Sequence, residues 1–290
     1  QTATGKSDFA VQVAKAVGGE IISADSRQVY KGMDLGTGKI TKKEMQGIKH
    51  HMLDVASPKK VFTVADFKKH TDKIIEKIVG NKKVPIICGG TGFYIDAVID
   101  NTVFPEVPPD TKLRKELAKK SAPELYKILL GLDKERAKNI DNNNPVRLMR
   151  AIEIAKALGK VPKISKSSKY DVLKIGLMLP DEVLKERILV RLKMRIKKGM
   201  LKEIENLHKD GVSWFRMDDL GLEYRYGAMH LQGKISKNEM IEKLNTEIWH
   251  YAKRQKTWFK RDKDTIWLDP RKKSSTNYIL KKVLGFLSYN

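Results

Sequence analysis

Cysteine and long apolar runs are the two features that this 290-residue sequence most clearly lacks. Cys88 is the only cysteine, so a disulfide within the chain and a zinc site built from several cysteines are both excluded. No apolar run approaches the roughly 20 residues that a membrane-spanning helix needs, and no secretory signal opens the chain. We therefore expect a cytoplasmic protein that has no membrane partner.

Acidic residues are also scarce relative to basic ones. The chain has 35 Asp and Glu residues against 58 Lys and Arg residues, which gives a formal net charge of +23. Such an excess attracts polyanions such as nucleic acids, although it could also be general surface charge without a specific role. The basic residues cluster at 112–120, 160–174, 187–202 and 253–263. This clustering favours a polyanionic partner.

Strand and helix signals alternate in the N-terminal part of the chain. Apolar residues at helical spacing from Phe9 to Val17 predict a helix that ends at Gly18-Gly19. Apolar runs at 20–24 and 84–88 predict strands, and residues 64–79 between them have helical periodicity. This order of elements predicts an α/β domain with a parallel sheet.

The pattern changes after Pro105, Pro108 and Pro109. From 110 to about 158 we expect only helices, the last with Pro145 in its first turn, followed by a polar and basic connection at 159–169. After this connection we expect four elements: a strand at 173–179, a long charged helix at 181–208, a last helix at 237–259 and a short strand at 265–268. We thus predict a core in two parts, 1–104 and 171–290, interrupted by an all-helical insertion domain at 105–170.

The strongest local signal is Thr4-Gly5-Lys6-Ser7 near the start of the chain. Together with the residues before it, this segment matches the end of a Gly-x-x-x-x-Gly-Lys-Ser phosphate loop, whose first glycine and preceding strand are missing here. Backbone N–H groups at the helix N-terminus would form an anion site, with Lys6 on the terminal phosphate and Ser7 on Mg²⁺. The motif leaves open whether the ligand is ATP or another diphosphate.

Two further segments could supply catalytic groups. Asp25 follows the predicted strand at 20–24, where active-site groups of open α/β sheets gather, so it could be a metal-shell ligand, a base or a turn cap. The glycine-rich loop at 89–92 could let a ligand approach closely, with Thr91 supplying a hydroxyl, or it could be a plain turn. For His50 and His51, capping or packing is a better interpretation than metal binding.

Taken together, these motifs resemble the tRNA dimethylallyltransferase family, also called isopentenyl-diphosphate:tRNA transferases, in its shorter bacterial form. The matching segments keep the family's order over almost the whole chain. They are TATGKS at 2–7, ISADSRQVY at 22–30, MDLGTGK at 33–39, HHMLD at 50–54, GGTGFY at 89–94, NPVRLMRAIE at 144–153, GLEYR at 221–225 and AKRQKTWF at 252–259.

The resemblance implies a P-loop NTPase-like parallel-sheet core with an inserted helical domain. It implies Asp25 as the base, Thr91 as the catalytic threonine, and dimethylallyl diphosphate with Mg²⁺ in the phosphate loop. The residues implied for the donor diphosphate are Thr2, Ala3, Thr4, Gly5, Lys6, Ser7, Arg187 and Arg191, with Ser7 also a metal ligand. Those implied for tRNA are Asp25, Ser26, Arg27, Gln28, Thr91, Arg114, Val146, Arg147, Leu148, Met149, Arg150, Gly221, Leu222, Glu223, Tyr224, Arg225 and Tyr226.

The reaction that the resemblance implies moves a dimethylallyl group to the exocyclic N6 of the adenosine next to the anticodon. We expect a monomer that binds the anticodon stem-loop and flips this adenosine into its site. The alternatives are an adenylate isopentenyltransferase acting on free AMP or ATP, a P-loop kinase of small molecules, and an RNA-binding protein with a vestigial nucleotide site. The charge of +23 argues against the first of these. This sequence departs from the family pattern in two ways. Its phosphate loop is incomplete, and it lacks the C-terminal zinc finger that eukaryotic relatives have.

Overall fold

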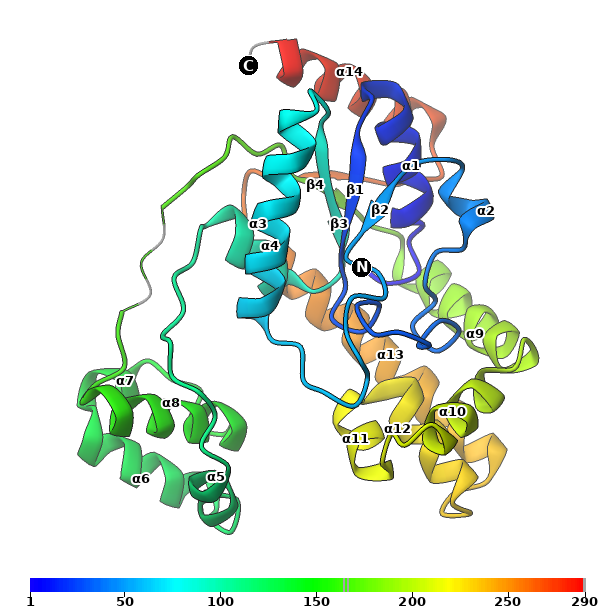
Figure 1. Cartoon of the computed structure of the whole chain (residues 1–290). Coiled ribbons are helices and arrows are strands. Elements are labelled where there is room, and N and C mark those ends of the chain that lie inside the picture. Colours follow the sequence, from blue (N-terminus) through cyan, green and yellow to red (C-terminus); the bar gives the residue numbers. More distant parts are fainter. Residues whose placement is uncertain (164, 166, 289–290) are drawn as a thin grey trace. The chain divides into compact units, whose positions relative to one another are not determined.

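The structure, a computed structural model, describes residues 1–163, 165 and 167–288. Its residues divide into two compact units (Figure 1). The first unit contains residues 1–100 and the described part of 168–290, and the second contains the described part of 101–167. Each unit has a hydrophobic core of its own. No helix in the described residues combines the length and apolar character that crossing a membrane requires.

A three-stranded parallel sheet lies in the first unit. β1 (Glu20–Ala24) pairs with β2 (His50–His51) on one side and with β3 (Pro85–Gly89) on the other. Every residue of β1 is buried, as expected for a parallel strand that is covered on both faces. A second parallel pair joins β4 (Ile175–Leu177) to β5 (Ile266–Leu268). The predicted α/β core with a parallel sheet is therefore confirmed.

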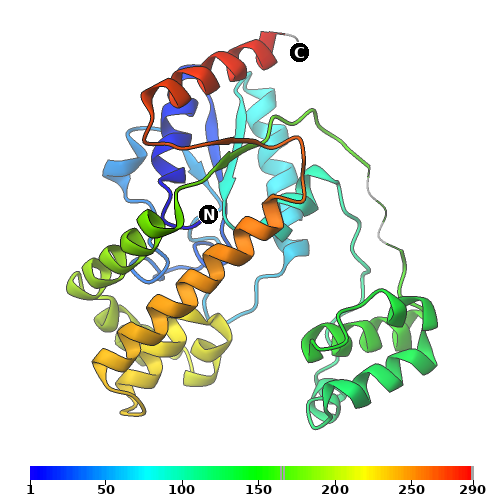
Figure 2. The same cartoon turned by 180° about the vertical axis from the view of Figure 1, so that it is seen from behind.

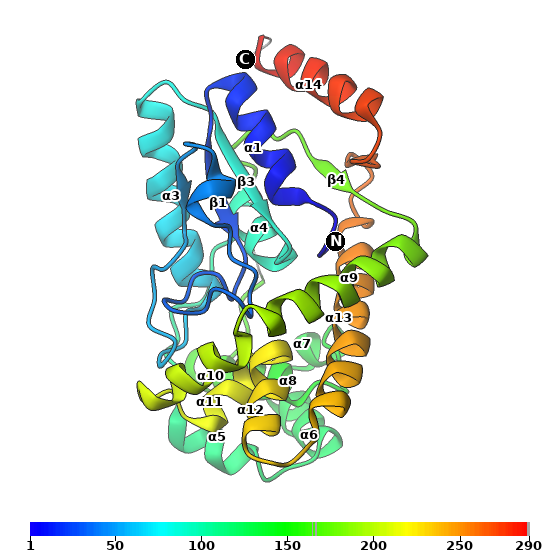
Figure 3. The ribbon, with the colours of Figure 1, turned by 90° about the vertical axis from the view of Figure 1, so that its right-hand side faces the viewer.

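Different helices cover the two faces of β1. Because neighbouring strand residues point to opposite faces, Ile21 packs against α1 (Lys6–Val17), and Ile22 packs against α3 (Val64–Gly80) and α4 (Gly92–Ile99). Figure 3 shows α1 and α3 on opposite sides of the sheet. The short helix α2 (Lys42–Met45) and the C-terminal helix α14 (Lys273–Ser288) both contact α1.

A run of helices forms a second core within the first unit. It consists of α9 (Asp181–Lys197), α10 (Met200–Lys209), α11 (Trp214–Leu220), α12 (Leu222–Leu231) and α13 (Lys237–Phe259). Val29, Tyr30 and Met33, from the chain that leaves β1, are buried in the same core. Helix α13 also reaches α4 near its C-terminal end (Figure 2). Helix α13 therefore links this helical core to α4, which covers one face of the sheet.

Three predictions about these elements are wrong in detail. The helix predicted at 181–208 is two helices, because Gly199 has a φ of 102°, a left-handed value that breaks the helix. The helix at 237–259 is confirmed, but it is not the last one, since α14 follows it. Burial of Ile279 and Val283 stabilises α14, although this Ser- and Thr-rich segment has a low helix propensity. The strand predicted at 173–179 covers only 175–177, where it pairs with β5.

The described residues of the second unit form helices and no strand, as predicted. The helices are α5 (Thr111–Leu117), α6 (Ala122–Leu132), α7 (Lys134–Lys138) and α8 (Pro145–Leu158). The Glu153 side chain is only 1% exposed and accepts hydrogen bonds from Arg114 at 2.6 and 2.8 Å and from Arg150 at 3.1 Å. Within the connection predicted at 159–169, Ile164 and Lys166 lie outside the described residues.

Candidate active site

The phosphate-loop segment lies at the N-terminus of α1. Gly5 is the N-cap with a φ of 88°, and no side chain of the described residues caps the first turn. Thr4 Oγ1 and Lys6 Nζ donate hydrogen bonds to the Gln1 carbonyl, at 2.9 and 2.5 Å, which fixes the shape of the loop. Uncapped N–H groups at a helix N-terminus attract anions. The loop can therefore hold a phosphate group.

Two half-buried cations converge on this loop. Burial is the main reason why the pKa of Lys6 is lowered, and the Arg191 charge on α9 adds to the effect. Burial, followed by repulsion from Arg195, lowers the pKa of Arg191 to about 10. Neither Lys6 nor Arg191 forms an ion pair among the described residues. Lys6 donates a hydrogen bond to the Gln1 carbonyl, but a bound anion would add the opposite charge that both desolvated cations lack among the described residues. Arg187 lies one turn earlier on α9 and is also half-buried.

Asp25 and Thr91 leave the sheet together at its carboxyl edge. Ala24 and Gly89, the last residues of β1 and β3, are paired in register. Thr91 Oγ1 accepts a hydrogen bond from the Ser26 N–H at 3.0 Å. Since this oxygen acts as an acceptor there, the hydroxyl proton of Thr91 remains available for a ligand.

The Asp25 carboxylate uses its two oxygens differently. Oδ1 accepts hydrogen bonds from the backbone N–H groups of Arg27, at 2.9 Å, and Gln28, at 3.3 Å, so the turn-capping interpretation of Asp25 is confirmed. Oδ2 has no hydrogen-bond partner in the part of the chain that the structure describes, and the half-buried carboxylate acts electrostatically on Lys6. Capping and proton acceptance are therefore compatible roles for this residue.

Close packing explains the glycines of the loop at 89–92. A Cβ atom on Gly89 would lie 2.1 Å from the Ala24 carbonyl oxygen, and one on Gly92 would lie 2.2 Å from the Trp258 ring. Neither neighbour is free to move, since one is strand backbone and the other is a ring held by α13. These glycines therefore let the loop pack between β1 and α13, which positions Thr91.

Gln255 of α13 joins the two loops. Its Oε1 accepts the Thr2 N–H at 2.6 Å, and its Nε2 donates to the Gly90 carbonyl at 2.9 Å. The side chain is 5% exposed, so a buried amide bridges the phosphate loop and the Thr91 loop. Gln255 has no role predicted from the sequence, although an amide on the apolar face of an amphipathic helix indicates a buried polar contact.

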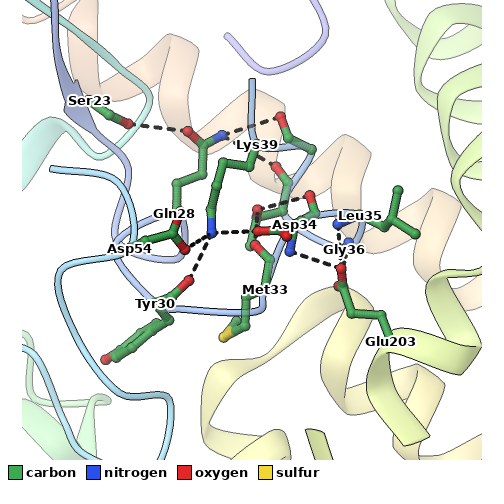
Figure 4. Close-up of polar contacts among 12 residues, drawn as sticks. Ser23, Gln28, Tyr30, Met33, Asp34, Leu35, Gly36, Lys39, Asp54 and Glu203 are labelled. Atoms are coloured by element: carbon green, nitrogen blue, oxygen red, sulfur yellow. Dashed lines mark hydrogen bonds and ion pairs between the residues drawn. The ribbon is translucent and has the colours of Figure 1, made fainter. Parts of the chain in front are cut away.

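Arg27 and Gln28 make contacts within the first unit. Arg27 Nε donates to the Leu220 carbonyl at 2.6 Å, at the end of α11. Gln28 accepts a hydrogen bond from Ser23 Oγ at 3.2 Å and donates to the Gly38 carbonyl at 3.4 Å (Figure 4). The side chains that follow Asp25 are thus oriented by α11 and by the loop at 33–39.

Lys39 holds that loop in place. Its side chain is 6% exposed, and Nζ donates to the Tyr30 carbonyl at 2.9 Å, to Asp34 at 2.7 Å and to Asp54 at 2.5 Å (Figure 4). All three protons of the ammonium group are therefore used in structural contacts. Lys39 therefore has a structural role and does not offer a free positive charge to a ligand.

The segment at 221–226 points partly inward. Glu223 is buried and pairs with Arg195 at 3.1 Å, and its burial raises the pKa of the carboxyl group. Tyr224 is also buried, and its hydroxyl donates to Glu203 at 2.9 Å. The half-buried residues of the segment are Gly221, Leu222, Arg225 and Tyr226.

The residues expected to contact tRNA from the second unit differ in exposure. Val146 and Arg147, in the first turn of α8, are exposed, whereas Leu148 is completely buried in the core. Met149 and Arg150 are half-buried, with Arg150 paired to Glu153. Arg114, also paired to Glu153, keeps 44% of its side chain exposed.

A basic hollow of about 530 Å³ lies along one face of α13. The Arg261 guanidinium lies 3.8 Å from the centre of the Trp258 ring. Cations beside aromatic rings are suited to phosphates and stacked bases. The residues that line the hollow are His250, Lys253, Arg254, Thr257, Trp258 and Arg261.

His51 pairs with Glu20 across the sheet, Nε2 lying 2.7 Å from Oε2. Hydrogen bonding by Lys83 is the main reason that the pKa of Glu20 falls to about 2. Among the described residues, no group of three or more His, Cys, Asp or Glu side chains could hold a metal ion. His51 therefore has a structural role, in which it pairs with Glu20.

Comparison with known proteins gives a consistent result. The profile of the family described as IPP transferase matches residues 28–262. The chain is 47% identical over 266 residues, 90% of this chain and 89% of the relative, to tRNA dimethylallyltransferase 2 of Treponema denticola. It is 33% identical to the crystal structure of the tRNA isopentenylpyrophosphate transferase from Bacillus halodurans, with a TM-score of 0.76 and coverage of 99% and 94%. A structure of a eukaryotic dimethylallyltransferase acting on tRNA matches with a TM-score of 0.74 at 27% identity, over 89% of this chain and 67% of that one. The resemblance noted in the sequence is thereby confirmed, and the chain belongs to the IPP transferase family.

Proposed function

We propose that this protein transfers a dimethylallyl group from dimethylallyl diphosphate to N6 of the adenosine next to the anticodon of tRNA. One observation carries the proposal: Gln255 joins the phosphate loop, which contains Lys6, to the loop that contains Thr91, and Asp25 shares the sheet edge with Thr91. Relatives named tRNA dimethylallyltransferase support the choice of donor and acceptor.

The donor diphosphate would lie on the first turn of α1. Backbone N–H groups, Lys6 and Arg191 would hold its oxygens and take up the negative charge that grows as the carbon–oxygen bond breaks. Arg187, which is one turn earlier on α9 and also half-buried, would add a further positive charge. The exposed hydroxyl of Ser7 is a hard oxygen donor that fits Mg²⁺, which would supply further charge neutralisation when bound.

The exocyclic amine of adenine is a weak nucleophile, because its lone pair is delocalised into the ring. As its nitrogen bonds to the prenyl carbon and diphosphate departs, the amine must lose a proton. Asp25 Oδ2 is the acceptor that we assign, and the Thr91 hydroxyl would donate to an oxygen of the diphosphate. Adenine can reach these groups only if the nucleotide leaves the stack of the anticodon loop.

The residues that would contact tRNA are those among the family's implied set whose side chains are exposed or only half-buried. Arg114, Val146, Arg147 and Arg225 are accessible, whereas Leu148, Glu223 and Tyr224 are buried and would act by shaping the surface. The basic hollow on α13 adds cations for the phosphate backbone. We also propose that the protein acts in the cytoplasm and as a monomer.

The decisive assay offers labelled dimethylallyl diphosphate to unmodified tRNA and to AMP in competition. We expect label in tRNA alone. Label in AMP would favour an adenylate isopentenyltransferase, and phosphate transfer from ATP to a small acceptor would favour a kinase. Binding of tRNA without any transfer would favour an RNA-binding protein with a vestigial site.

A further inference from the structure

An internal carboxylate occupies an anion site in the loop at 33–39. Glu203 of α10 accepts hydrogen bonds from three consecutive backbone N–H groups: Oε2 from Asp34 at 2.9 Å and Leu35 at 2.6 Å, and Oε1 from Gly36 at 3.0 Å (Figure 4). Successive N–H groups that converge in this way form a nest, an arrangement suited to anions. Glu203, which fills this nest, lies 167 to 169 positions after the three residues in the sequence.

The same carboxylate also binds α12. The buried Tyr224 hydroxyl donates to Glu203 Oε1 at 2.9 Å. Gly36 packs so tightly on Tyr224 that a Cβ atom there would lie 2.7 Å from the tyrosine ring. Glu203 therefore fixes three pieces of the first unit against one another: the loop, α10 and α12.

The same loop also contacts Gln28, which lies close to Asp25 in the chain, and Arg195 of α9. Its Gly38 carbonyl receives the Gln28 amide, and a Cβ atom on Gly38 would lie 1.9 Å from the Arg195 guanidinium. Arg195 in turn donates to the Gly36 carbonyl at 3.2 Å and acts on the charge of Arg191. A shift of the loop would therefore move Gln28 beside Asp25 and would disturb the arginines beside the phosphate loop.

We infer that Glu203 is a positioning residue for prenyl transfer: filling the nest with its carboxylate keeps the loop in the arrangement that orients Gln28 and Arg195. Glu203 itself touches no reacting atom. The expected effect of Glu203 on the rate of transfer rests on the proposed function. The expected effect of Glu203 on the structure of the loop does not. Because misplacement of catalytic groups by about 1 Å can cost about 10²-fold, we expect the effect to fall on turnover.

The test uses Glu203→Ala, which leaves three convergent N–H groups without an acceptor at a half-buried position. We expect turnover of tRNA to fall by about 10²-fold and to recover partly when formate, a small carboxylate, is added. Glu205→Ala is the matched control, since Glu205 lies on the same helix and pairs with Lys202 and Lys209 at the surface, its only ion pairs among the described residues. Its turnover should match wild type, with no response to formate.

Hydrogen exchange at 34–36 separates this inference from the proposed function. In Glu203→Ala these amides should exchange faster, and formate should protect them again, whether or not the wild type prenylates tRNA. If Glu203→Ala does not fold, the isosteric Glu203→Gln takes its place, with an intermediate loss of turnover and of protection expected. Unchanged protection at 34–36, or a folded variant whose turnover is near wild type, would overturn the inference.

Discussion

Replacing Asp25 with asparagine tests the chemistry of the site without disturbing its shape. Oδ1 caps the turn through the N–H groups of Arg27 and Gln28, and an asparagine oxygen can accept both bonds. Since Asn and Asp cap equally well, the free energy of unfolding should change by less than about 1 kcal/mol. Oδ2, the oxygen assigned to the proton, becomes an amide nitrogen that cannot accept it. Loss of a general base typically lowers the rate by about 10² to 10⁴, so single-turnover transfer should fall by that order.

Asp269→Asn is the matched control for this substitution. Asp269 also follows a strand, and its Oδ1 accepts the Arg271 N–H at 3.0 Å, close to the 2.9 Å of the corresponding bond in Asp25. The control should transfer at the wild-type rate. Both variants should bind tRNA and donor normally, because the base matters most as the proton leaves. If Asp25→Asn keeps more than about a tenth of the wild-type rate, Asp25 is a turn cap and not the base.

Three further predictions concern the donor, the tRNA and the second unit. Lys6→Ala should impair use of the donor while leaving tRNA affinity nearly intact, as kinetics at varied donor and separate tRNA binding would reveal. The affinity for tRNA should drop roughly 10³-fold from low to moderate salt, and a flat salt series would contradict a phosphate-binding surface. Burial would raise the pKa of Glu153, but hydrogen bonds from Arg114 and Arg150 outweigh it and lower the pKa below 4.5. The stabilisation is therefore present above pH 4.5 and lost as the pH falls through the folded-state value. Glu153→Gln should cost about 2 kcal/mol at neutral pH, the usual size of a hydrogen bond to a charged group, and remove this acid dependence, measured by urea unfolding across an acid series.

Local patterns were sufficient to predict much of the fold. The apolar run of β1 and the amphipathic pattern of α13 gave the bounds that the structure has, because burial and helix capping by Ser236 act within a few residues. Gly199 is a residue whose conformational freedom could have indicated the break between α9 and α10. Helix α14 was missed because its stability comes from packing against α1 and the strands rather than from its own propensity.

The candidate site was predictable only for residues inside recognisable motifs. Asp25 and Thr91 were chosen as candidates because each follows a predicted strand, and strand ends meet at one edge of a parallel sheet; their catalytic roles stay predictions that come from the family resemblance. The position of Gln255 on the apolar face of α13 indicates a buried polar contact, but Gln255 and Glu203 contact partners more than 160 residues away, and no spacing in the sequence indicates those partners. The inward orientation of Glu223 and Tyr224 likewise depends on the packing of α12 against α10 and on Arg195.

The most direct test of the central claim is the location of the transferred group. Unmodified tRNA, incubated with the protein, Mg²⁺ and dimethylallyl diphosphate, is digested with ribonuclease and its fragments are analysed by mass spectrometry. We predict the mass of one dimethylallyl group on the fragment that contains the adenosine next to the anticodon, and none when guanosine replaces that adenosine. Modification of other fragments, or transfer to AMP in place of tRNA, would contradict the account.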